Sequence, residues 1–129
     1  MIVLDTHIWI WWVGEDARLS GAHAIAIAAE TDVGVSAMSC WEVAKLVALG
    51  RLDLDRPVDA WLDRALAATG CRLLPLTPEI AVAATTLPGD FHREPADQII
   101  VATARVWACP LLTVDRKLID YPHVETPPP

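Results

Sequence analysis

The stretch Ile2-Val3-Leu4-Asp5-Thr6 decides how this chain folds. Three aliphatic residues in succession, without polar alternation, predict a strand buried on both faces, as in the middle of a parallel sheet. The strand ends at Asp5, and a charge at the edge of an apolar core is costly unless something cationic meets it. Ligands of open parallel sheets bind beyond the carboxyl ends of the strands, so Asp5 is the first candidate functional residue.

The composition predicts one compact domain. The chain has 129 residues, of which 53% are hydrophobic, enough for a substantial core. We place the domain at residues 1–125 and a proline-rich tail, which cannot form regular structure, at residues 126–129. Asp5 and His7 interrupt the opening apolar run and no basic residue precedes it, which argues against a signal peptide or membrane anchor. We therefore expect a cytoplasmic protein that does not contact a membrane.

The formal net charge of −7 has the wrong sign for a protein that binds nucleic acid through phosphate contacts alone. If nucleic acid is the substrate, positive charge must come from metal ions or from local patches such as Arg93 and Arg116-Lys117. A basic protein partner would also suit this charge.

Neither the cysteines nor the histidines predict a metal site. The cysteines at positions 40, 71 and 109 are odd in number and lack Cys-x-x-Cys spacing, so we expect small core residues and no disulfide. The histidines at positions 7, 23, 92 and 123 lack the spacing of metal ligands.

Predicted strands and helices alternate along the chain, which implies βαβ units and an α/β fold with helices on both faces of a parallel sheet. Helix starts are read from the caps Ser20, Ser39 and Thr77, and Gly50 ends the helix that Ser39 opens. After the first strand, the predicted strands cover residues 33–36, 71–74 and 110–114. The predicted helices follow Asp5 up to Gly14, and cover residues 21 to about 30, 40–49, 59–68, 78 to about 87, and 95–106.

The tryptophans of the first predicted helix give it an aromatic face. Trp9 and Trp12 suit either core packing, which we favour, or a surface that binds a partner.

Four acidic residues stand at functionally suggestive places. Asp5 and Asp115 follow predicted strands, whereas Glu42 and Asp97 lie in the first turns of predicted helices. Strand ends and helix starts meet at one edge of a parallel α/β sheet, so the four acids could converge. A few carboxylates around an open site suit Mg²⁺ or Mn²⁺ better than zinc, and such a site can hydrolyse phosphodiesters.

Each of these acids also has a structural interpretation. The helix dipole alone favours Asp97 in a first turn, and Asp115 could cap the next short helix. Glu42 stands three residues after Ser39 and could complete a capping box. Asp5 is the hardest to explain in this way, because its strand is so apolar.

Segments spread over almost the whole chain resemble, in order, the motifs of PIN-domain ribonucleases, specifically the VapC-type toxins of bacterial toxin-antitoxin systems. They are residues 2–7 (IVLDTH), 36–45 (SAMSCWEVAK) with 49–52 (LGRL), 92–97 (HREPAD) and 112–115 (LTVD). The resemblance implies a Rossmann-like α/β/α sandwich around a parallel sheet of about five strands. It also implies an Mg²⁺- or Mn²⁺-dependent endoribonuclease that acts on RNA, a cognate antitoxin of a type II system, and commonly a homodimer.

The same resemblance assigns roles to individual residues. The catalytic and metal-binding acids would be Asp5, Glu42, Asp97 and Asp115, with Thr6, Thr113 and Glu94 as accessory residues. The chain departs from the family at two positions. The family loop more often reads His-Arg-Asp-Pro, with an arginine directly after the third acid, where this chain has Glu94 and Gln98. Gln98 therefore removes a cation that could contact substrate phosphate.

Other classes of protein remain as alternatives. A receiver domain of a phosphate-signalling pathway is also a small, acidic, Mg²⁺-binding α/β protein, but it should carry neighbouring acids after its first strand. Here Asp5 is followed by Thr6 and His7, and Leu74-Pro75 ends the third strand where a phosphoacceptor aspartate would be expected. His7 also argues against the Asp-x-Asp pair of a phosphatase. A PIN-like domain that binds a partner without turnover is the third alternative.

Overall fold

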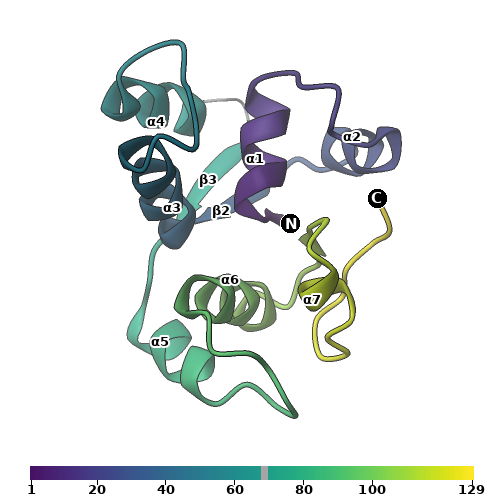
Figure 1. The fold of residues 1–129 in the computed structure, drawn as a ribbon. Helices are drawn as coiled ribbons and strands as arrows, with labels where there is room; N and C mark the ends of the chain where they lie inside the picture. The colour runs from purple at the N-terminus through teal and green to yellow at the C-terminus, as the bar shows by residue number, and fades with distance from the viewer. Residues whose placement is uncertain (68–69) are drawn as a thin grey trace.

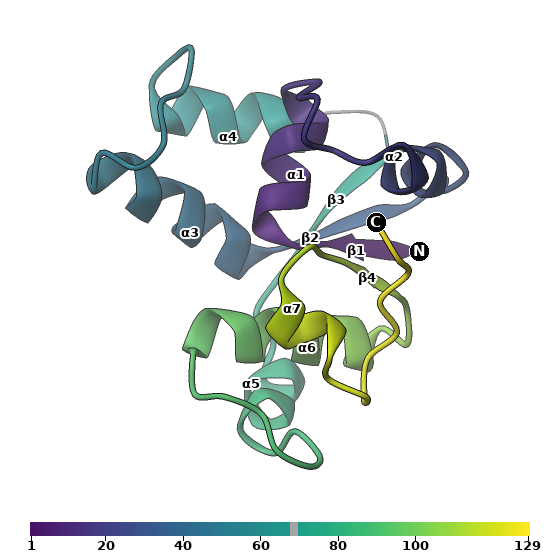
Figure 2. The ribbon, with the colours of Figure 1, turned by 45° about the vertical axis from the view of Figure 1, so that its right-hand side comes forward.

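A parallel sheet of four strands in the order β3-β2-β1-β4 forms the centre of the computed structural model, which describes residues 1–67 and 70–129. Helices cover both of its faces (Figures 1 and 2). The predicted α/β class with a Rossmann-like arrangement is confirmed. The strands are β1 (Ile2–Leu4), β2 (Val33–Ser36), β3 (Cys71–Leu74) and β4 (Leu111–Leu112).

Two groups of helices pack on opposite faces of the sheet because alternate strand residues point to opposite sides. Leu4 packs in one core with Trp9 and Val43, whereas Val3 packs in another with Ile100 and Leu118. In Figure 2 the first four helices lie on one side of the strands and the last three on the other. The helices are α1 (Thr6–Val13), α2 (Gly21–Ala28), α3 (Ala37–Ala48), α4 (Val58–Leu66), α5 (Pro78–Thr85), α6 (Pro95–Val106) and α7 (Arg116–Ile119).

The sheet has one strand fewer, in the described residues, than the expected number of about five. The chain after α7 does return to the free edge of β4, where the Leu111 backbone N–H donates to the Glu125 carbonyl at 2.9 Å. Three prolines follow at positions 127–129, and these residues have no N–H with which to extend a ladder. The tail forms no helix or strand, and the Pro127 carbonyl lies 3.1 Å from His23 Nε2 on α2.

The predicted start of α3 was wrong. The cap is Ser36, whose hydroxyl accepts a hydrogen bond from the Met38 backbone N–H at 3.1 Å, and the helix begins at Ala37. Strand β2 therefore leads into α3 without a loop. Ser39 lies buried inside the helix, so it forms no capping box with Glu42, which is the sixth residue of α3 and not part of its first turn.

Other boundaries moved by a few residues. Strand β4 is shorter than predicted because the chain turns at Thr113, whose hydroxyl accepts a hydrogen bond from the Asp115 backbone N–H. Helix α2 ends at Ala28 and α5 at Thr85, each earlier than predicted. The helix predicted for residues 59–68 is α4, capped at its end by Ala67, and Ala68 lies outside the described residues.

The core interpretation of the first tryptophan is confirmed. Trp9 is fully buried and packs edge-on against Trp61, with ring centroids 5.2 Å apart, while Trp12 packs against the same core and is partly exposed. The cysteines at positions 40, 71 and 109 are free thiols, half-buried at the margins of the cores. None of the helices in the described residues is long and apolar enough to cross a membrane.

Candidate active site

The four acids predicted from the sequence line one cavity at the carboxyl edge of the sheet. Asp5 follows β1 and Asp115 follows the short β4, while Glu42 projects from α3 and Asp97 from the first turn of α6. The cavity has a volume of about 180 Å³ and is lined by Asp5, Thr6, His7, Ile8, Glu42, Asp97, Val114 and Asp115. Residues more than 100 positions apart in the sequence therefore meet in one place.

Asp5 is held from two sides. As the cap of α1 it accepts a hydrogen bond from the Thr6 backbone N–H at 2.9 Å through Oδ1, and Oδ2 accepts from the Thr113 hydroxyl at 2.6 Å. Burial raises the pKa of the Asp5 carboxyl above its ordinary value, these hydrogen bonds oppose the rise, and the negative charge of Asp97 adds to it. The site therefore holds a carboxylate that its surroundings only partly compensate.

A hydroxyl relay positions Glu42. The Thr6 hydroxyl donates to Glu42 Oε1 at 2.6 Å, and Ser39 Oγ lies 2.9 Å from the same Thr6 oxygen. Because a hydroxyl carries one proton, the Ser39 hydroxyl is left to donate to Thr6. Ser39, which the sequence had suggested as a helix cap, thus supports the residue that orients Glu42.

The surroundings of Glu42 disfavour its charge. Burial raises the pKa of this carboxyl, the hydrogen bond from Thr6 lowers it, and the charges of Asp5, Asp97 and Glu94 raise it further. Like charges that face one cavity destabilise each other unless a cation or a proton enters. The electrostatics of the cavity therefore favour a bound cation.

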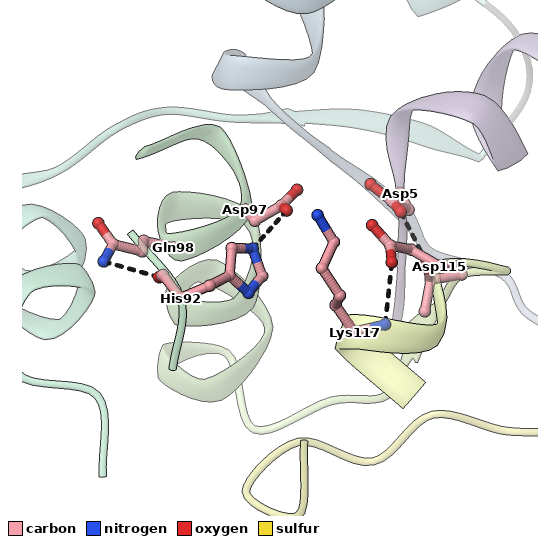
Figure 3. A network of polar contacts seen from close by, with 7 residues as sticks. Asp5, His92, Asp97, Gln98, Asp115 and Lys117 are labelled. Carbon is pink, nitrogen blue, oxygen red and sulfur yellow. Dashed lines mark hydrogen bonds and ion pairs between the residues drawn. The ribbon is translucent and has the colours of Figure 1, made fainter. Parts of the chain in front are cut away.

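Asp97 is held by a histidine that the sequence patterns did not identify. His92 Nε2 lies 2.7 Å from Asp97 Oδ2, and the side-chain amide of Gln98 donates to the His92 carbonyl at 3.1 Å (Figure 3). The His92 ring also stacks on Phe91, with centroids 4.3 Å apart. Gln98, a departure from the family motif, thus steadies the loop that carries His92. The only hint in the sequence is that His92 stands five residues before Asp97. The fold of the loop brings the two side chains into contact.

Asp115 performs the capping role that its sequence position suggested. Its Oδ1 accepts from the Lys117 backbone N–H at 2.9 Å at the start of α7, and its own N–H donates to Thr113 Oγ1 at 3.0 Å. The Thr113 hydroxyl, fully buried, therefore donates to Asp5 and accepts from Asp115. The capping interpretation and the position in the cavity are both observed.

The three accessory residues do not behave alike. Thr6 and Thr113 each donate a hydrogen bond of 2.6 Å to one of the acids. Glu94 is exposed and lies outside the acid cavity, on a neighbouring groove of about 620 Å³ that Trp41 and Lys45 also line. Glu94 acts on the site through its charge, as its effect on the pKa of Glu42 shows.

The donor set suits a hard divalent cation. All four acids offer carboxylate oxygens, the ligands that Mg²⁺ and Mn²⁺ prefer. Within residues 1–67 and 70–129, no three His, Cys, Asp or Glu side chains lie close enough together to hold an ion between them. Mg²⁺ commonly takes one or two protein carboxylates and keeps several waters, so a cavity of about 180 Å³ lined by separate carboxylates fits its chemistry.

Comparison with known proteins gives a consistent result. The model of the PIN domain family matches residues 2–124. Ribonuclease VapC22 from Mycobacterium tuberculosis is 38% identical over 122 residues, which are 95% of this chain and 92% of that protein. Among solved structures, a toxin-antitoxin complex from Klebsiella pneumoniae aligns with 99% of this chain and 98% of the solved chain, with a TM-score of 0.70 and 20% identity. VapC20 from M. tuberculosis, a Sarcin-Ricin loop cleaving toxin, aligns with 99% of this chain and 100% of the solved chain, with a TM-score of 0.70 and 18% identity.

Proposed function

The chain belongs to the PIN domain family, and on this premise we propose that it is a divalent-metal-dependent endoribonuclease, the toxin of a type II toxin-antitoxin pair. The observation that carries the proposal is the convergence of Asp5, Glu42, Asp97 and Asp115 on one cavity. The relative named a ribonuclease supports the reaction class, and the solved toxin described as cleaving the Sarcin-Ricin loop supports RNA as the substrate.

The acids would hold Mg²⁺ or Mn²⁺ and leave room for the phosphodiester. When bound, such an ion supplies positive charge that polarises the phosphate and lowers the pKa of a water molecule. Asp5 and Glu42 are the first candidates to bind it, because burial and mutual repulsion already disfavour their uncompensated charge. Binding of the ion relieves this repulsion and therefore stabilises the folded chain.

The remaining polar groups keep the carboxylates in place. Thr113 fixes one oxygen of Asp5, and Thr6 fixes one oxygen of Glu42. His92 fixes one oxygen of Asp97. Each of these carboxylates has more lone pairs than these hydrogen bonds use. Such partners of metal ligands typically matter for activity by roughly 10- to 100-fold.

The direct test is RNA cleavage by the purified protein in Mg²⁺ or Mn²⁺, with EDTA as the negative condition. Asp97→Asn should abolish most cleavage, whereas Asp90→Asn, a change to an exposed acid outside the cavity, should not. Absence of cleavage under every metal condition would contradict the nuclease proposal. It would favour a domain that binds a partner without turnover.

We also propose a protein antitoxin as the partner and a homodimer as the oligomeric state. The groove beside the acid cavity shares Glu42 with it and exposes Trp41 and Leu49, whose exposed fractions are 52% and 55%. A partner segment with apolar anchors and a basic residue would complement this groove and the acids. The solved toxin-antitoxin complex with the same fold supports such a partner.

The test of the partner is binding and inhibition by the product of the adjacent gene. Light scattering of the isolated chain gives its oligomeric state. A neighbouring protein that neither binds nor inhibits would contradict the toxin-antitoxin assignment and leave the nuclease proposal standing.

A further inference from the structure

Lys117 brings a positive charge to the mouth of the acid cavity. It is the second residue of α7, and its backbone N–H donates to Asp115. In Figure 3 its side chain runs away from α7 and its ammonium lies, in that view, between the carboxylates of Asp97 and Asp115. The Lys117 side chain is exposed and is not one of the residues that line the cavity, but it runs toward the acids Asp97 and Asp115.

The adjacent cation is directed elsewhere. Arg116 Nη2 lies 3.6 Å from Asp120 Oδ1, and both side chains are largely exposed. Successive residues of a helix point about 100° apart, so α7 separates two cations that are neighbours in the sequence. Among the described residues, Lys117 forms no ion pair within 4.0 Å. Its ammonium therefore faces the acids without being bound to one of them.

The chain carries no cation at the position next to the third acid, Asp97. Gln98 stands there, and its side-chain amide is engaged with the His92 carbonyl. An RNA phosphate that approaches four carboxylates meets repulsion, which a positive group beside the cavity reduces. Lys117 is placed to supply that group, because its flexible stem lets a compact ammonium follow a phosphate.

We propose that Lys117 is a substrate-binding residue whose ammonium contacts the RNA phosphate that enters the acid cavity. The inference rests on the proposed nuclease function and names one residue of its substrate site. The Lys117 ammonium donates N–H hydrogen bonds to non-bridging phosphate oxygens. Its contribution is to binding, so it appears mainly in KM.

The test compares Lys117→Met with Arg116→Met, a matched change at the neighbouring position. The substrate is a 5′-labelled pool of single-stranded RNA of random sequence, cleaved in Mn²⁺ at several salt concentrations. Each phosphate contact on a single strand contributes about 0.7 to the slope of log affinity against log salt. Lys117→Met should raise KM several-fold and reduce the magnitude of that slope for kcat/KM by about 0.7. Arg116→Met should leave KM and the slope as in the wild type. Lys117→Arg, which keeps the positive charge, should change them less than Lys117→Met does.

Melting in EDTA separates binding from folding. We expect the melting temperatures of both methionine variants to stay close to that of the wild type. If Lys117→Met instead alters melting and metal affinity but leaves KM and the salt slope unchanged, Lys117 is a counter-ion of the acids and the inference is overturned. Wild-type protein that fails to cleave RNA overturns the nuclease proposal and this inference together. Cleavage by the wild type with an unchanged slope in Lys117→Met overturns only the inference.

Discussion

The two walls of the acid cavity are built in different ways. On one wall, Asp5 and Glu42 accept hydrogen bonds from hydroxyls that lie 108 and 36 residues away in the sequence. On the other wall, Asp97 and Asp115 are held by His92 and by the Lys117 backbone, only five and two residues away. The pair Asp5 and Glu42, the distant wall, depends on how the sheet is assembled. The pair Asp97 and Asp115, the local wall, depends on local turns.

The two walls should therefore respond differently to mutation. Burial raises the pKa values of Asp5 and Glu42. The charged carboxylates of the distant wall therefore lower the stability of the metal-free fold. In the local wall, Asp97 lies in the first turn of α6 and Asp115 caps the four-residue α7. Its partners are the partly buried His92 side chain and the exposed Lys117 backbone N–H. Changes to the distant wall should therefore affect folding and activity together, and changes to the local wall mainly activity.

The largest expected effect follows Glu42→Gln, which removes a charge from the distant wall and keeps its shape. Cleavage should fall by more than the roughly 100-fold that marks the upper range for partners of metal ligands. The melting temperature in EDTA should rise, because the change removes an unfavourable charge while the Thr6 hydroxyl can still donate to the amide oxygen. Wild-type cleavage across a Mg²⁺ titration would rule out Glu42 as a ligand.

A second change, Thr113→Val, should lower both stability and activity. It leaves Asp5 Oδ2 and the Asp115 backbone N–H without their buried partner, at a cost of about 1–3 kcal/mol in the free energy of unfolding. Activity should fall roughly 10- to 100-fold. Thr103→Val is the matched control, since Thr103 is equally buried but bonds only to the Ile99 carbonyl of its own helix. Equal losses from the two variants would contradict a special role for Thr113.

The pH dependence of stability should reveal the unfavourable charge of the Glu42 carboxylate. A carboxyl whose pKa is raised in the folded state contributes stability that is complete below its unfolded pKa and is lost as pH rises through the folded value. In EDTA, the stability of the wild type relative to Glu42→Gln should therefore fall as pH rises above about 4.5, the ordinary pKa of glutamate. Denaturant unfolding at several pH values measures this difference. Excess Mn²⁺ should cancel the fall, and a pH-independent difference in EDTA would contradict it.

The smallest effect on folding is expected from His92→Asn, on the local wall. Loss of its contact with the Asp97 carboxylate should lower cleavage by about tenfold, at the lower end for partners of metal ligands. The free energy of unfolding should change by only about 0.5 kcal/mol, because the pair is partly exposed. Kinetics and denaturant unfolding measure the two effects. A loss of stability as large as that of Thr113→Val would remove the distinction between the walls, and exposed His123→Asn serves as the control.

How much of the site could be predicted depends on the wall. Asp115 as the cap of α7 and Asp97 in the first turn of α6 were readable from neighbouring residues, and the structure has both. The support of Glu42 was not, because Ser36 and Ser39 are both good caps and the choice between them depends on where β2 ends. His92 was not predicted, because it lacks the spacing of a metal ligand and instead orients the acid Asp97.

The sequence by itself determined the α/β alternation, the buried first strand with Asp5 at its end, and the set of acids that face one edge of the sheet. These features follow from propensities and periodicities that act over a few residues. Only the tertiary structure decided that Thr113 bonds Asp5, that Ser39 and Thr6 together hold Glu42, and that Lys117 turns to the cavity while Arg116 turns away. The reason is the strand order, which places β4 and β2 on either side of β1 and so joins side chains that no local pattern connects.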